Sequence, residues 1–85
     1  MNNTEFLESL FPRVMREADI PRNPESFHVV TFWSGARSVA VTYRLGEDRF
    51  GVDLLDGTSF GAGSDNWVEG REKTKERIHD LLFGV

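Results

Sequence analysis

The sequence predicts an α+β domain in which one antiparallel sheet, a meander of three or four strands, carries an N-terminal and a C-terminal helix on one face. Three observations lead to this prediction. Apolar residues recur at helical spacing near each end of the chain, the middle alternates apolar and polar residues, and short Gly-containing segments separate the alternating runs. The expected order is α-β-β-β-(β)-α, with residues 1–85 in a single small globular domain.

The N-terminal segment predicts an amphipathic helix over residues 4–19. Its apolar residues fall within one half of the helical circumference, and Asn2 or Asn3 can cap the first turn. Pro12 lies on the opposite face, but it lacks a backbone N–H and restricts the residue before it, so we expect a kink or a brief break there. Residues 20–24 contain two prolines and are expected to form an extended linker.

Three runs in the middle of the chain predict strands: residues 27–33 are rich in aromatic and β-branched residues, and residues 39–45 and 50–55 alternate apolar and polar side chains. The segments between them are typical of hairpin connections, at residues 34–37 and 46–48. The Asp56-Gly57 pair is a strong turn signal, so residues 58–60 can add a short fourth strand.

The strands are expected to turn one set of side chains toward the helices and the other set away from them. Strict alternation places Val39, Val41 and Tyr43 of the second strand under the helices. The first strand is apolar on both faces, and we assign its odd-numbered residues to the same helix-covered face, namely Phe27, Val29, Thr31 and Trp33.

A second helix is predicted from Trp67 or Gly70 to Phe83, with Gly84 as its stop. Its inward stripe includes Arg71, Ile78 and Leu81. Because Arg71 shares this apolar stripe, we expect its stem to lie along the core and its guanidinium to reach an acid, namely Asp53, Asp56 or Asp65.

Composition narrows the classes of function that the chain can serve. The net charge is −4, and an acidic balance argues against generic binding to a phosphate backbone. The sequence contains no cysteine, which favours a reducing, cytoplasmic setting. The N-terminal residues lack the basic and apolar regions of a signal peptide, and no apolar run is long enough for a membrane span, so no membrane partner is expected.

Two Gly-containing motifs suggest chemistry but lack the context that the chemistry needs. Residues 57–61 match the G-x-S-x-G pattern around Ser59, yet they begin inside a predicted hairpin turn and not at a strand-to-helix elbow. Residues 61–64 precede the second helix as an anion-binding loop would, but they carry neither the third glycine nor the lysine of the known phosphate-binding patterns. A tight hairpin and a helix cap account for both segments.

The acidic and histidine residues predict no metal or catalytic centre. The acids near the turns lack calcium-loop spacing, namely Asp48, Asp53, Asp56 and Asp65. His28 and His79 lie far apart in the sequence, and neither neighbours a nucleophile. We therefore expect no enzyme activity, no metal and no cofactor.

The outward face of the sheet is the best functional clue in the sequence. With the odd-numbered residues of the first strand under the helices, its remaining residues would face solvent beside Thr42 and two charged neighbours. An apolar centre with a charged rim is typical of an interface. The predicted partner-binding residues are His28, Val30, Phe32, Thr42, Arg44 and Asp53.

These observations predict a small non-catalytic protein-binding domain of regulatory, adaptor or inhibitor type. The open face could serve either self-association as a homodimer or capture of a different protein. The alternative is RNA binding, because the order α-β-β-β-α resembles the topology of double-stranded RNA-binding domains and basic residues begin the second helix, at positions 71, 73, 75 and 77. The basic signature motif of those domains is absent, and acids interleave with these bases, so nucleic acid is the less favoured partner.

Overall fold

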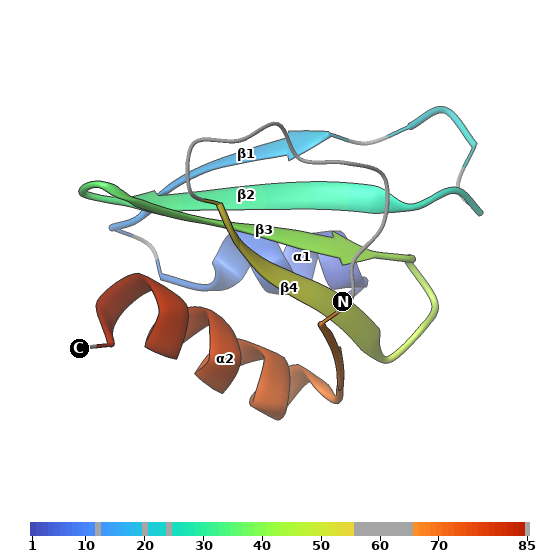
Figure 1. Ribbon diagram of the computed structural model, residues 1–85. Helices are drawn as coiled ribbons and strands as arrows, with labels where there is room; N and C mark the ends of the chain where they lie inside the picture. The colour runs from blue at the N-terminus through green and yellow to red at the C-terminus, as the bar shows by residue number, and fades with distance from the viewer. Residues whose placement is uncertain (12, 20, 24, 56–65, 85) are drawn as a thin grey trace.

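A five-stranded antiparallel sheet carries two helices on one face in the computed structural model of the chain (Figure 1). The structure describes residues 1–11, 13–19, 21–23, 25–55 and 66–84. The elements are α1 (Asn3–Ser9), β1 (Met15–Asp19), β2 (His28–Ser34), β3 (Arg37–Tyr43), β4 (Arg49–Leu55), β5 (Trp67–Glu69) and α2 (Arg71–Phe83). The strands lie side by side in sequence order, which confirms the predicted α+β class and the meander.

The N-terminal helix is much shorter than predicted. A capping box between Asn2 and Glu5 starts α1, but the helix ends at Ser9 and Leu10 is already extended. Phe11 adopts a φ of 48°, outside the helical region, and it precedes a proline, which disfavours helical geometry for the residue before it. The chain therefore turns back, and residues that fitted a helical stripe form the edge strand β1 instead.

The register of β2 against β3 reverses the predicted orientation of β2. Ser34 pairs with Arg37, so the hairpin loop has only two residues, and Gly35 takes a φ of 62° at the first of them. In this register Phe32 lies opposite Val39 and Val30 lies opposite Val41. Cross-strand partners point to the same face, so the even-numbered residues of β2 enter the core.

The assignment of the odd-numbered residues of β2 to the helix-covered face is therefore wrong. That assignment requires a connection one residue longer or shorter, because a one-residue slip exchanges the two faces of a strand. The orientation of β3 is confirmed, since Val39, Val41 and Tyr43 are fully buried on the helix side.

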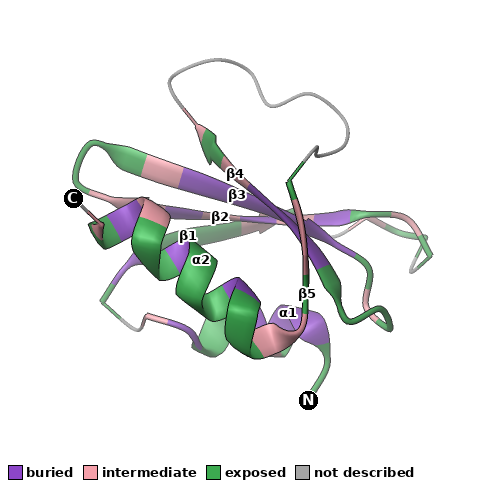
Figure 2. Cartoon of the chain, turned by 60° about the horizontal axis from the view of Figure 1, so that its bottom comes forward, coloured by how far each residue is buried: buried purple, intermediate pink, exposed green. Residues whose placement is uncertain are grey.

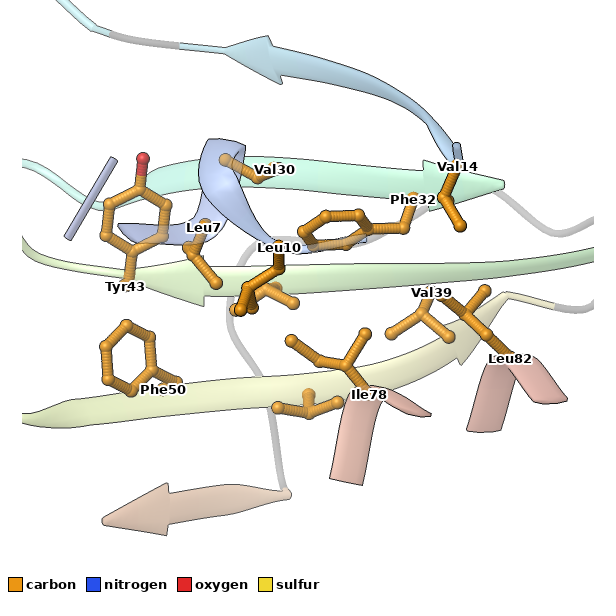
Figure 3. Packing of buried hydrophobic residues seen from close by; sticks show 12 residues of the cluster. Leu7, Leu10, Val14, Val30, Phe32, Val39, Tyr43, Phe50, Ile78 and Leu82 are labelled. Carbon is orange, nitrogen blue, oxygen red and sulfur yellow. The ribbon is translucent and has the colours of Figure 1, made fainter. Parts of the chain in front are cut away.

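The core lies between the sheet and the two helices (Figure 3). Figure 2 shows buried residues along the sheet-facing side of α2 and exposed residues along its outer side. The helix contributes Thr74, Ile78 and Leu82, whereas Leu81 is only half-buried. The strands contribute the largest buried rings, those of Phe32, Tyr43 and Phe50.

A single asparagine joins three parts of the fold near the start of α1. Asn3 is buried, and its amide nitrogen donates hydrogen bonds of 2.7 Å to the carbonyl oxygens of both Arg44 and Glu47 in the β3–β4 connection. Its amide oxygen accepts hydrogen bonds of 3.0 and 3.2 Å from the guanidinium of Arg71. These four bonds connect α1 to the sheet and to α2.

Arg71 therefore ties the helices together, but not through a carboxylate as predicted. Its guanidinium also donates to the carbonyl oxygen of Met1 and lies 5.1 Å from the ring centre of Phe6. The amide oxygen of Asn3 accepts hydrogen bonds from the guanidinium at this partly buried position, so no second charge is buried there. At the other end of α2, Arg37 donates to the carbonyl oxygens of Leu81 and Gly84, where the helix dipole favours a cation.

Neither helix in the described part of the chain combines the length and the apolar character that crossing a bilayer requires.

Residues 58–60, predicted as a short strand, lie outside the described residues. The sequence does not predict β5 as a strand, because the second helix is expected to start at Trp67 or Gly70, which places these three residues in its first turn or just before it.

Replacing Phe32 with Ala should lower the free energy of unfolding by about 3–5 kcal/mol, because the ring is 0% exposed and its loss leaves a cavity. Phe83→Ala is the matched control: this ring is 43% exposed, so its loss should cost about 1 kcal/mol. Urea unfolding measures both. Equal losses for the two variants would contradict the register of β2.

A double-mutant cycle between Asn3→Ala and Arg71→Met should give a coupling energy of about 1 kcal/mol or more, because the two side chains share hydrogen bonds that each single substitution breaks. Denaturant unfolding of the two single variants and the double variant measures it. Effects that add to within about 0.5 kcal/mol would show that Asn3 and Arg71 act independently.

Candidate partner-binding surface

Three of the six predicted partner-binding residues lie in the core. His28, Val30 and Phe32 are 1%, 0% and 0% exposed, on the side of the sheet that the helices cover. Their expected place on the outward face is wrong, and the cause is the two-residue loop that sets the register of β2. In this structure they are closed to a partner.

The other three predicted residues lie on or beside the outer face, but they do not form an open apolar centre. Thr42 is only 1% exposed, and its neighbour on that face, Ala40, is buried too. Asp53 lies opposite Ala40, is half-buried and accepts a 2.8 Å hydrogen bond from Asn66. Arg44 follows β3 and is exposed. The middle of the outer face is therefore closed, and the accessible side chains lie toward its ends.

One accessible area lies across the edge strand β1 and the C-terminal end of β2. Met15 is 74% exposed and lies opposite the half-buried Trp33 of β2. Together with Arg16, Glu17 and Gly35 they line a groove of about 510 Å³. Met15 and Trp33 are its apolar lining residues, and Arg16 and Glu17 are its charged lining residues. We call this area the edge groove.

The second accessible area is a stack of aromatic rings and guanidinium groups at the other end of β2. The rings of Phe27 and Trp67 lie 5.8 Å apart, the Arg44 guanidinium lies 4.4 Å from the ring centre of Phe27, and Arg49 lies 4.3 Å from that of Trp67. Arg44 also forms an ion pair of 3.1 Å with Glu47. Each ring already has a guanidinium group over one face. These cation–π contacts are made within the chain, and they stabilise the segment that enters β2.

The buried polar groups near α1 were not predicted as a site. Thr4 and Tyr43 share a buried hydrogen bond of 2.5 Å, and the His28 ring lies 5.4 Å from that of Tyr43. Burial raises the pKa of Tyr43 above its ordinary value of 10.0, Glu8 adds to the rise, and the bond to Thr4 opposes it. Tyr43 is thus a neutral hydrogen-bonding group at physiological pH. Both nitrogens of His28 are buried and have no hydrogen-bond partner among the described residues.

Candidate chemistry elsewhere falls partly outside the described residues, which include neither Ser59 and its Gly-rich motif nor Asp56 and Asp65. Within the described ranges, no group of three or more His, Asp and Glu side chains could hold a metal ion. His79 is exposed on α2, and its ring lies 5.1 Å from that of Phe83.

The basic start of α2 divides into one engaged and three exposed residues. Arg71 is held by Asn3, whereas Lys73, Lys75 and Arg77 point to solvent. Acids on the same helix surface, at positions 72, 76 and 80, are exposed among them. This surface carries both signs of charge.

The sequence did not predict the residues of the edge groove, because two structural assignments were wrong. Met15 was assigned to the N-terminal helix, and Trp33 was assigned to the buried face of its strand. The available signals were Pro12, which limits the helix, and the Gly35-Ala36 pair, whose length suits a two-residue hairpin.

Comparison of the chain with protein-family models, with curated proteins and with solved structures finds no match. Its function is therefore inferred from its own residues.

Tyr43 is the single tyrosine of the chain, so the ultraviolet absorbance of tyrosinate reports its ionisation alone. The midpoint in folded protein should lie above 10.0 and return toward that value in denaturant. As the pH rises, the unfolded state therefore loses the tyrosine proton before the folded state does. The stability that comes from the raised pKa of Tyr43 is fully present below about pH 10, and it is lost as the pH rises through the folded pKa.

Thr4→Val should raise this midpoint further, because it removes the hydrogen bond that favours the phenolate. Circular dichroism recorded in parallel shows whether the chain is still folded. A midpoint at or below 10.0 in folded protein would contradict the burial of Tyr43.

Proposed function

We propose that the chain is a non-catalytic protein-recognition domain that binds a partner polypeptide along the free edge of β1. One observation carries the proposal: among the described strands β1 pairs only with β2, and residues of this edge strand line the edge groove together with Trp33 and Gly35. A strand edge offers unpaired backbone N–H and C=O groups, and a groove beside it can select side chains.

The composition of β1 suits selective binding better than indiscriminate pairing. Three of its five residues are charged, namely Arg16, Glu17 and Asp19, and all three are exposed. Charged side chains on an edge strand discourage pairing with arbitrary strands, because each opposing residue must match the charge that it meets. Such an edge resists aggregation and still accepts a complementary segment.

The apolar side chains of the edge groove supply the energetic reason for binding. Met15 and Trp33 leave apolar surface in water, and the indole N–H of Trp33 makes no hydrogen bond within the described residues. Tryptophan is prominent among residues that dominate binding energy, since it combines a large apolar ring with a hydrogen-bond donor. A partner side chain in the groove would cover both residues.

Protein is a better supported partner than RNA. The outer side of β1 is acidic, and Arg71, one of the four bases that suggested RNA, is engaged within the fold. The remaining bases of α2 are interspersed with acids, which weakens attraction to phosphates.

We also infer that the protein acts in the cytoplasm, because its sequence contains no cysteine.

Selection from a displayed library of random peptides tests the proposal. The wild-type chain should enrich peptides that fail to bind the double variant Met15→Ser, Trp33→Ser. The matched control, Leu54→Ser with Phe83→Ser, removes two other exposed apolar side chains, 52% and 43% exposed, and should retain the same peptides.

Circular dichroism should show that both double variants fold. If no peptides are enriched, or if the enriched peptides bind the edge-groove variant as well as the wild type, the proposed function is wrong.

A further inference from the structure

We propose that the partner enters as an extended segment that adds to β1 as an antiparallel strand, with basic residues opposite Glu17 and Asp19 and an apolar residue beside Met15 and Trp33. This inference rests on the proposed function and specifies the chemistry of the partner. It follows from the faces to which the β1 side chains point, from their charges, and from the like charges that a second copy of the chain would bring together.

The register of β1 against β2 assigns each β1 side chain to a face. Met15, Glu17 and Asp19 lie opposite Trp33, Thr31 and Val29, which point to the outer face. Arg16 and Ala18 lie opposite Phe32 and Val30 and therefore share the helix-covered face. Directly opposed residues of an added strand would point to these same faces.

The outer side of β1 carries two negative charges that nothing in the described structure neutralises. Glu17 and Asp19 are exposed and form no ion pair among the described residues, and their opposite residues on β2 are uncharged. An incoming strand with cations at alternate positions would pair with both. On the helix side, Arg16 is exposed and forms no ion pair within the described part of the chain, so an acid is preferred opposite it.

A second copy of the chain fits this edge poorly. Antiparallel pairing of two identical edges requires a two-fold axis perpendicular to the sheet, because the rotation must reverse the strand and keep the faces unchanged. The central register opposes Glu17 to its own copy. A shift one way opposes Arg16 to Arg16, and a shift the other way opposes Glu17 to Asp19. Each of these three registers, which overlap most of β1, places like charges together.

The complementary segment therefore has a defined order. Read antiparallel to β1, from the position opposite Asp19 to that opposite Met15, it is basic, apolar, basic, acidic and apolar. A capped synthetic peptide with the run Lys-Val-Lys-Glu-Leu has this pattern. The control run Glu-Val-Lys-Lys-Leu has the same composition and net charge, but it places Glu opposite Asp19 and Lys opposite Arg16.

Titration of the isotope-labelled chain with each peptide, followed by NMR, tests the inference. The first peptide should shift the amide signals of β1 and the indole N–H of Trp33, and added salt should weaken its binding. The control peptide should bind severalfold more weakly. The variant Glu17→Lys, Asp19→Lys should abolish the preference between these two peptides and favour a peptide with the run Glu-Val-Glu-Glu-Leu, because Arg16 is unchanged and still favours an acid opposite it.

Equal binding of the two peptides, absence of any shift in β1, or concentration-dependent pairing of β1 with a second copy would overturn the inference. Library selection separates this failure from failure of the proposed function. Peptides that require Met15 and Trp33 but lack the charge pattern would keep the function and discard the strand-addition mode.

Discussion

The two-residue loop between β2 and β3 sets which side chains of β2 enter the core, and most of the structure depends on it. Because Ser34 pairs with Arg37, Phe32 and Val30 lie beside Val39 and Val41, and the helices cover all four. A strand has only two faces, so placing one set inside leaves Trp33 and its neighbours outside. The same hairpin that completes the core thus supplies the aromatic wall of the edge groove.

Polar contacts determine how the helices sit on that core. Asn3 satisfies two carbonyl groups of the β3–β4 connection and receives Arg71, so a single buried side chain fixes α1 against both the sheet and α2. Arg37 meets the last carbonyl groups of α2 at the opposite end. Burial of apolar area is non-directional, whereas hydrogen bonds demand specific distances and angles. In a chain of 85 residues these bonds supply orientation that a small core cannot specify alone.

The early end of α1 connects the fold to its proposed function. Phe11 leaves helical geometry before Pro12, and the following residues extend the sheet by a strand whose outer edge has no partner among the described strands. Had the helix continued, Met15 and Glu17 would have lain on a helix surface, and β2 would have formed the edge. β1 instead presents Glu17 and Asp19 on its outer side and Met15 in the edge groove, and the proposed recognition of an extended segment rests on this arrangement.

The sequence by itself determined the class of the fold, the meander, the positions of β2, β3 and β4, and the inward face of β3. These features depend on local periodicity, which for β3 allows only one face toward the core. It did not determine the face of β2, because both sides of that strand are apolar and either could be buried. It also did not distinguish β1 from a helix, since Val14 and Ala18 fit both periods. Tertiary structure decided the face of β2 through the hairpin register, and it decided the conformation of β1 through the end of the helix before Pro12. The candidate site follows from these two features. A site formed where strands meet depends on pairing between distant residues, which local spacing cannot specify.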